Sequence, residues 1–480
     1  MSPKPDGLSQ LEIRLKQDLS WLDLPAKDWV IGHKVDTHPM IDVAIIGAGM
    51  AGMAAAAALR LLGVKVVLFD RAPNGFEGPW ATTARMETLR SPKQLTGPAL
   101  GLPALTFRAW FEAQFGALAW DSLDKIPRLQ WMDYLRWYRR VLDLDVRNEH
   151  AIRDVIPIKS GHVQLQLDTP RGPHIVHARR VIIASGRDGL GGPFVPDFAR
   201  TLPKQYWAHS SDPIDSTFFK NKRIGVIGAG ASAMDSAATA LEAGATSVDL
   251  LIRRQDMPRI NKGKGAGNPG LTHGHIDLPD EWKWRIRHYI NSQQVPPPRG
   301  STLRVSKFSK ARFNFGCPIK QIAVKNDHIH IVTPRSDFDV DFVIFSTGFR
   351  IDWRARPEYA RIAPFVRAWK DRFQPNAHEY DQELMDSPDL GGVFELQEKS
   401  ANACPGLESI HCFCYPAALT HGTISGDIPA ISDGAKRLAQ GIVSSLYRED
   451  VEQYYERITK FDEPELFGDE WIAADRPSTV

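Results

Sequence analysis

Two stretches of the chain repeat one pattern of apolar and polar positions. Residues 42–71 read "DVAIIGAGMAGMAAAAALRLLGVKVVLFDR", and residues 223–254 read "RIGVIGAGASAMDSAATALEAGATSVDLLIRR". In each stretch a short apolar run precedes a glycine-rich turn, a helical stretch and a second apolar run that ends in a charged residue. Short continuous apolar runs bounded by glycine are typical of strands buried in a parallel sheet. The pattern therefore predicts two βαβ units and an α/β fold.

Each unit continues through short alternating strands and ends at a Ser/Thr-Gly dipeptide. The first runs through "HVQLQLD" and "HIVHA" to Ser185-Gly186, and the second through "HIHIV" and "DFDVDFVIF" to Thr347-Gly348. This duplication predicts two nested Rossmann-like domains, of which the second interrupts the first. The predicted parts are an N-terminal helical extension (1–40), a discontinuous first domain (41–215 and 340–447), a second domain (216–339) with a loop-rich insertion (255–318), and a C-terminal tail (448–480).

The glycine turns are the first candidate sites. In the first unit Gly47 permits a tight turn, Gly49 lets the backbone approach a pyrophosphate, and Gly52 allows close helix–strand packing. In the second unit Gly228 and Gly230 take the same roles, Ala233 occupies the third position, and Ser232 beside it is a further candidate for cofactor binding. Amides at such a helix start favour phosphate, helped by the helix dipole. A glycine turn without a ligand is the alternative, but the strand, turn, helix and terminal charge together favour two dinucleotide sites.

The charges that end the two units differ in sign. Asp70 ends the second strand of the first unit, where a carboxylate accepts hydrogen bonds from ribose hydroxyls and repels a 2′-phosphate. Arg253 and Arg254 stand at the corresponding place in the second unit, and guanidinium groups suit a phosphate dianion. A solvated strand end is the alternative for the arginines. Because two NADPH sites would serve no purpose, the contrast predicts FAD in the first unit and NADPH in the second.

Composition narrows the classes of partner. The 480 residues carry a formal charge of +2, with acids and bases interspersed, so no nucleic-acid or acidic-membrane partner is expected. No apolar run approaches the length of a membrane span, and the N-terminus lacks a signal-peptide core, so a cytoplasmic location is expected. The four cysteines form no Cys-x-x-Cys, which argues against a dithiol redox centre and a zinc ribbon. No metal site is predicted.

Several short motifs give the chain a family resemblance. "GFEGPW", with Gly78 and Trp80, and "STGF", with Thr347 and Gly348, resemble the Gly-Gly-x-Trp and Ala-Thr-Gly-Tyr/Phe motifs of the class B flavoprotein monooxygenases. Of the motif that precedes the second glycine turn in that group, only His209 is present, which argues against a Baeyer–Villiger enzyme. "TLRSPKQ", "HSS", "DYLRW" and "THGTISGD" resemble segments of the amine N-hydroxylases in the same group.

The resemblance implies a fold of the glutathione-reductase and flavin-containing-monooxygenase type. It further implies that NADPH reduces FAD, that a flavin hydroperoxide forms with O₂, and that a small-molecule substrate is oxygenated, with N-hydroxylation of an amine preferred. S-oxygenation and Baeyer–Villiger oxidation remain alternatives through the same intermediate. An NADPH-dependent flavin reductase or dehydrogenase without oxygen insertion, a flavin-bearing sensor without turnover, and a homodimeric state also stay open.

The same resemblance implies roles for individual residues. Arg90 is expected to contact flavin or NADP near the reacting edge, with a surface ion pair as the alternative. His209 is expected at the crossover between domains, where it contacts NADP or fixes the hinge. His421 and Asp427 are expected near the pyrimidine end of the flavin, with a helix N-cap as the alternative for Asp427. Trp80 stacks near the flavin ring or packs in the core. The insertion and the stretch "ELQEKSANACPGLESI" are expected to form the substrate pocket.

Overall fold

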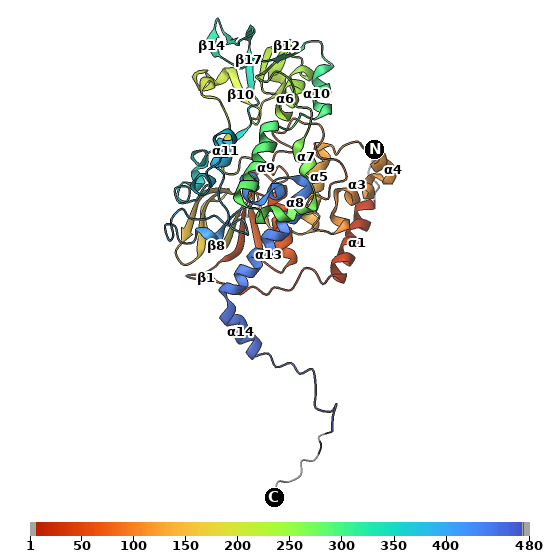
Figure 1. Ribbon diagram of the computed structural model, residues 1–480. Helices are drawn as coiled ribbons and strands as arrows, with labels where there is room; N and C mark the ends of the chain where they lie inside the picture. Colours follow the sequence, from red (N-terminus) through yellow and green to blue (C-terminus); the bar gives the residue numbers. More distant parts are fainter. Residues whose placement is uncertain (1–5, 473, 475–480) are drawn as a thin grey trace.

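The computed structural model describes residues 6–472 and 474. Figure 1 shows a smaller α/β unit at the top, a larger one below it, and helix α9 (Asp280–Gln293) between the two. Short continuous apolar strands build the central sheet of each unit, as the sequence pattern predicts. The α/β architecture with two nucleotide-type units is therefore confirmed.

The larger sheet has the strand order β5-β4-β3-β8-β7-β6, with β19 paired to β8. Its strands are β3 (Ile41–Ile46), β4 (Val66–Phe69), β5 (Val146–Arg147), β6 (Ala151–Ile158), β7 (His162–Thr169), β8 (Gly172–Ile183) and β19 (Ile410–Cys412). Ile45 of β3 aligns in parallel with Leu68 of β4 on one side and Ile182 of β8 on the other. The carboxyl ends of β3 and β4 therefore meet at one edge of the sheet, where ligands of such folds bind.

The smaller sheet is parallel and has the order β10-β17-β11-β12-β13. Its strands are β10 (Trp207–His209), β11 (Arg223–Ile227), β12 (Ser247–Ile252), β13 (Ala311–Phe315) and β17 (Phe342–Phe345). A three-stranded antiparallel sheet covers it, formed by β14 (Gln321–Lys325), β15 (His328–Val332) and β16 (Asp337–Val340). Two further pairs are β1 (Lys34–Val35) with β2 (His38–Pro39), and β9 (Gly191–Pro193) with β18 (Phe349–Ile351).

The predicted domain boundaries are wrong at two strands. Strand β10 falls in the predicted first domain (41–215) but pairs with β17 in the smaller sheet. Strand β17 falls in the predicted segment 340–447 and pairs with β11. Both strands lie where the chain crosses between the units, and parallel strands take their partners from distant segments, so local pattern does not assign them.

Helices cover both sheets and fill the space between the units. They are α1 (Gly7–Trp21), α2 (Met50–Leu61), α3 (Phe107–Phe115), α4 (Ala117–Ser122), α5 (Arg128–Val141), α6 (Ala231–Glu242), α7 (Lys262–Ala266), α8 (Pro269–Gly274), α9 (Asp280–Gln293), α10 (Arg299–Ser306), α11 (Gln382–Met385), α12 (Ala418–His421), α13 (Ile431–Glu449) and α14 (Val451–Thr459). Trp131, Tyr134 and Tyr138 of α5 are fully buried, as their helical spacing predicts. No described helix is long and apolar enough to cross a membrane.

The insertion at 255–318 is helical where the sequence predicts mainly loop. It contains α7, α8, α9 and α10, and several of its prolines stand at helix starts, where proline is favoured. Trp284 of α9 is fully buried against Trp369, Leu384 and Leu419 of the larger unit. Helix α9 therefore belongs to the insertion in sequence and to the larger unit in packing.

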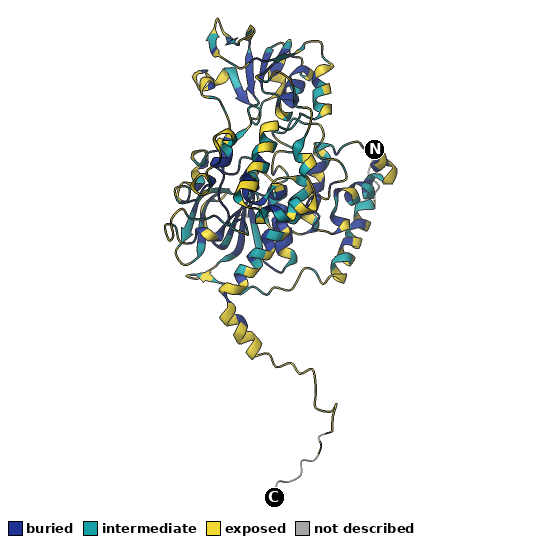
Figure 2. Ribbon diagram, viewed as in Figure 1, coloured by how far each residue is buried: buried dark blue, intermediate teal, exposed yellow. Residues whose placement is uncertain are grey.

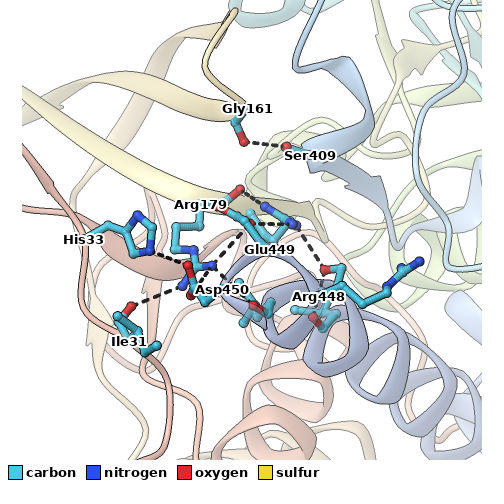
Figure 3. A network of polar contacts seen from close by, with 12 residues as sticks. Ile31, His33, Gly161, Arg179, Ser409, Arg448, Glu449 and Asp450 are labelled. Atoms are coloured by element: carbon cyan, nitrogen blue, oxygen red, sulfur yellow. Dashed lines mark hydrogen bonds and ion pairs between the residues drawn. The ribbon is translucent and has the colours of Figure 1, made fainter. Parts of the chain in front are cut away.

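A buried ion-pair network fixes the end of α13 to the larger sheet (Figure 3). Arg179 of β8, which is 1% exposed, lies 2.8 Å from Asp450 and 3.2 Å from Glu449. His33 Nε2 approaches Asp450 Oδ1 at 2.8 Å, which ties the N-terminal extension to the same point. In Figure 2 the chain beyond this anchor, including α14, is largely exposed. The predicted tail (448–480) thus begins inside α13 and is helical to Thr459.

Candidate functional site

The first glycine turn has a steric reason for each glycine. Gly47 has φ +101°, and a Cβ there would lie 2.8 Å from the carbonyl oxygen of Ala184. A Cβ on Gly52 would lie 2.0 Å from the carbonyl oxygen of Gly47, so α2 packs directly on the turn. Gly49 precedes α2, and its missing Cβ would point toward Gly78 Cα at 4.0 Å. Gly49 and Gly78 together leave bare backbone at the helix start, which fits a pyrophosphate.

Asp70 follows β4 and links it to this turn. Its Oδ2 accepts a hydrogen bond from the Ala48 amide at 2.7 Å, and its Oδ1 accepts one from the Ala72 amide at 2.8 Å. Burial raises the pKa of Asp70, while the two amide bonds oppose the shift. A carboxylate has about four acceptor positions, so two remain for ribose hydroxyls. The first unit therefore fits an adenine dinucleotide.

The second glycine turn has a similar backbone geometry, with more free space around its second glycine than in the first turn. Gly228 has φ +138°, and a Cβ there would lie 2.5 Å from the carbonyl oxygen of Ser346. Gly230 precedes α6, and a Cβ there would have nothing within 4 Å. Ala233 is fully buried in the helix–sheet contact, whereas Ser232 is exposed beside the helix start. This turn fits a second phosphate-containing ligand.

The two arginines after β12 have different surroundings. Arg253 is exposed, and Arg254 donates from Nη2 to the carbonyl oxygen of Ser292 at 2.9 Å, near the end of α9. Arg254 therefore ties α9 to the strand end, and Arg253 is the freer of the two for a phosphate. The sequence predicts the same role for both arginines and does not foresee this division.

Arg90 and Asp427 lie close enough for their charges to interact. Arg90 donates from Nη2 to the carbonyl oxygen of Pro296 at 2.6 Å. Burial lowers the pKa of Arg90, and the negative charge of Asp427 opposes this shift. Asp427 keeps contact with solvent but is enclosed on most sides, and this desolvation raises its pKa against the pull of Arg287 and Arg90. Asp427 occupies the N-cap position of a 3₁₀ turn (Ile428–Ala430), as the alternative predicts, but its side chain makes no capping hydrogen bond.

His421 is more deeply buried than a role in cofactor binding requires. His421 is 0% exposed, stacks on Phe394 at 3.7 Å, and approaches the Gly391 carbonyl with Nε2 at 2.9 Å. Burial lowers the pKa of His421 to about 3. The ring is therefore part of the core and has no exposed surface for a cofactor, while a position of this segment near the pyrimidine end of the flavin stays a prediction. Its neighbour Gly422 has φ +75°, and a Cβ there would lie 3.5 Å from His275 Cγ.

His209 ends β10 at the crossover between the units, as the sequence predicts. It is 1% exposed, its Nδ1 pairs with Ser211 Oγ at 2.7 Å, and its ring meets the edge of Phe349 at 5.5 Å. Burial lowers the pKa of His209. This neutral, enclosed ring fits the structural alternative, in which His209 fixes the hinge.

The remaining predicted residues are Thr347 and Gly348 at the crossover and Trp80 beside α5. Thr347 Oγ1 donates to the Phe194 carbonyl, and Gly348 has φ +86° with open space where a Cβ would stand. Trp80 is half-buried and meets Trp131 edge-on at 6.5 Å, so it packs on the core and still presents surface to the site.

A small pocket adjoins this region and was not predicted residue by residue. It is lined by Arg287, Asn291, Ile351, Glu383, Leu384, Ser387, Tyr415, Pro416, Ala418 and Leu419. Arg287 donates from Nη2 to Tyr415 Oη at 2.6 Å. Arg187 lies over the Tyr415 ring at 3.5 Å and pairs with Glu383 at 3.2 Å. The insertion contributes α9 as expected, whereas the stretch 395–410 does not line this pocket.

Comparisons with known proteins agree with this geometry. The sequence profile of the family described as pyridine nucleotide-disulphide oxidoreductase matches residues 41–263. The FAD-dependent urate hydroxylase of Xanthomonas campestris pv. campestris is 36% identical over 475 residues, which cover 96% of this chain and 98% of the relative.

Solved structures share the fold at low sequence identity. The ornithine hydroxylase from Pseudomonas aeruginosa superposes with a TM-score of 0.68 at 15% identity, over 85% of this chain and 99% of that one. The Kutzneria sp. 744 ornithine N-hydroxylase gives 0.64 at 16% identity, over 86% and 100%. The bacillithiol disulfide reductase from Staphylococcus aureus gives 0.54 at 15%, over 85% and 99%. The expectation of a flavin-dependent oxidoreductase is confirmed, and the chain belongs to the family of the FAD-dependent urate hydroxylase.

Proposed function

We propose that this enzyme uses NADPH and O₂ to hydroxylate a planar, anionic purine of the urate class. The observation that carries the proposal is the 36% identity to a urate hydroxylase, because it extends over 96% of this chain. The ornithine hydroxylases are about 15% identical and support only the shared fold.

The charge around the pocket supports an anionic substrate. Arg287 lines the pocket, and Arg187 lies on its Tyr415. The carboxylate of Glu383, which also lines the pocket, is paired with Arg187 at 3.2 Å, so the charge of Arg287 is the one left for a substrate. Urate is an anion at neutral pH, and its planar ring suits the face of an aromatic side chain. The ammonium group of a small amine would instead meet guanidinium groups, which repel it. N-hydroxylation of an amine stays as the second candidate, supported by "TLRSPKQ" and "HSS".

The residues that hold the two cofactors follow from the turns. The turn at Gly47 and Gly49 with Asp70 holds FAD, and the turn at Gly228 and Gly230 with Arg253 holds NADPH. When bound, these cofactors supply hydride transfer and the activation of O₂ for oxygen insertion. Overall, one oxygen atom enters the substrate, and the other leaves as water with the two electrons of NADPH.

The chain's own contribution is binding, orientation and the exclusion of water. Leu384 and Leu419 give the pocket apolar walls, and the buried Trp284 holds α9 over the region between the units. A dry wall beside the reacting atoms limits side reactions with solvent. Glu383 and Asp427 are carboxylates of this region, and oxygen insertion into an electron-rich substrate places little demand on a general base.

A substrate panel tests the proposal. The FAD-loaded full chain is mixed with NADPH and O₂ and with urate, uncharged hypoxanthine, L-ornithine or a sulfide, one at a time. Urate is expected to accelerate NADPH oxidation and to disappear in equal amounts. Consumption of L-ornithine without consumption of urate would favour the second candidate. A rate of NADPH oxidation that none of the compounds changes would favour a reductase.

A further inference from the structure

Helix α9 carries one arginine that differs from the other buried arginines of the chain. Arg287 follows Trp284 by three residues, so both side chains lie on the helix face that packs on the larger unit. Arg287 is 9% exposed, yet among residues 6–472 and 474 no carboxylate oxygen lies within 4.0 Å of its guanidinium nitrogens. Its hydrogen bond within that part of the chain goes to the neutral Tyr415 hydroxyl at 2.6 Å.

The comparison with similar arginines makes the missing counterion informative. Arg179 pairs with Asp450 at 2.8 Å, Arg304 with Glu242 at 2.7 Å, and Arg356 with Asp188 at 3.3 Å. An enclosed charge without a close counterion is costly, and a bound anion is one way to offset that cost. Arg287 lines the pocket, so an anion bound there would complete its environment.

The neighbours of Arg287 hold it in place, and Asp427 interacts with its charge from beyond ion-pair distance. The Tyr415 hydroxyl accepts one guanidinium hydrogen, and the Tyr415 ring is itself fixed under Arg187, whose charge Glu383 balances at 3.2 Å. Asn291 lies one helical turn beyond Arg287 and lines the same pocket, where its amide can donate and accept. The pocket thus offers the guanidinium group of Arg287, the amide of Asn291 and the aromatic ring of Tyr415.

We propose that Arg287, oriented by Tyr415, binds the anionic edge of the substrate and determines the preference for urate-class oxopurines over uncharged ones. This inference rests on the proposed function for the identity of the substrate. A planar guanidinium fits two adjacent acceptors of a flat anion, which a lysine ammonium does not match. Tyr415 is a positioning residue, since it acts on the substrate through Arg287.

The test compares four variants of the FAD-loaded full chain. Arg287→Gln is expected to raise the KM for urate by about 10- to 100-fold, the range of a charge-assisted hydrogen bond. Arg287→Lys keeps the charge and is expected to recover part of that loss. Tyr415→Phe keeps the ring, and a several-fold rise in KM is expected. Arg285→Gln is the matched control on the same helix, because Arg285 is exposed and pairs with Glu281 and Glu379.

The KM for NADPH separates this role from a role in cofactor binding. An unchanged KM for urate in Arg287→Gln, or an equal rise in the KM for NADPH, would overturn the inference while leaving the proposed function standing. If the wild type does not consume urate, the proposed substrate class fails, and urate binding is then followed through the absorbance of the oxidised flavin. If the wild type binds urate and Arg287→Gln binds it more weakly, the assignment of Arg287 stands. If the wild type does not bind urate, that assignment is overturned together with the proposed substrate class.

Discussion

Asp70 accepts a hydrogen bond from the amide of Ala48 at 2.7 Å, which joins the end of β4 to the glycine turn after β3. The same carboxylate is the group proposed to accept hydrogen bonds from ribose hydroxyls, in addition to shaping the turn. Local sequence pattern and three-dimensional geometry agree at this residue.

Replacement of Asp70 is therefore expected to weaken FAD binding in a graded way. Asp70→Ala removes both acceptors and is expected to lower FAD affinity by about 10- to 100-fold, from the loss of charged hydrogen bonds. Asp70→Asn keeps one acceptor oxygen and should lose less. The measurement is titration of the flavin-free protein with FAD. Equal FAD affinity in wild type and Asp70→Ala would contradict the assignment.

The arginines after β12 are expected to set the coenzyme preference. Arg253→Gln should lower the ratio of kcat/KM for NADPH over NADH by about 10-fold or more, because a charge-assisted phosphate bond is lost. Arg254→Gln should have a smaller effect on that ratio, since Arg254 already donates to Ser292. Steady-state kinetics with both coenzymes measure this. A ratio that neither substitution changes would contradict NADPH binding at this strand end.

Two glycines offer a matched pair for the steric argument. A Cβ on Gly52 would lie 2.0 Å from the Gly47 carbonyl oxygen, whereas a Cβ on Gly230 would have nothing within 4 Å. Gly52→Ala is expected to cost about 1–3 kcal/mol of folding free energy or more, as overpacking does. Gly230→Ala should keep the midpoint of urea denaturation and weaken NADPH binding. The reverse order of the two midpoints would count against the turn geometry.

Two buried histidines predict how stability depends on pH. Burial lowers the pKa of His421 to about 3 and that of His411 to about 4. Below the ordinary histidine pKa the unfolded chain binds protons that the folded chain does not, so stability is lost as pH falls through this window. Each histidine adds up to about 1.4 kcal/mol per pH unit. Urea unfolding between pH 7 and pH 4.5 measures the slope, and a flat profile would contradict their neutral burial.

The parts of the fold that are local in sequence could be predicted, and the parts that join distant segments could not. Each glycine turn, helix and terminal charge lies within one contiguous βαβ unit, so its pattern is complete in the sequence. Strands β10 and β17 were assigned to the wrong unit because their partner strands lie far along the chain. The helices of the insertion were missed because glycine, proline and lysine at their ends suggested loop.

The candidate site divides in the same way. Asp70 and Arg253 could be predicted because the strand before each one fixes its position. Arg287, Arg187 and Tyr415 meet only in the folded chain, and no local motif joins residues so far apart. His421 was assigned to the flavin from its neighbours in "THGTISGD", but the side chain turns into the core.

The fate of oxygen tests the central claim, that this chain couples NADPH oxidation to hydroxylation of its substrate. The measurement follows NADPH, O₂, urate and hydrogen peroxide together in one reaction of the FAD-loaded enzyme. With urate present, we expect equal consumption of NADPH, O₂ and urate with little peroxide. Peroxide equal to the NADPH oxidised, with urate untouched, would contradict the account.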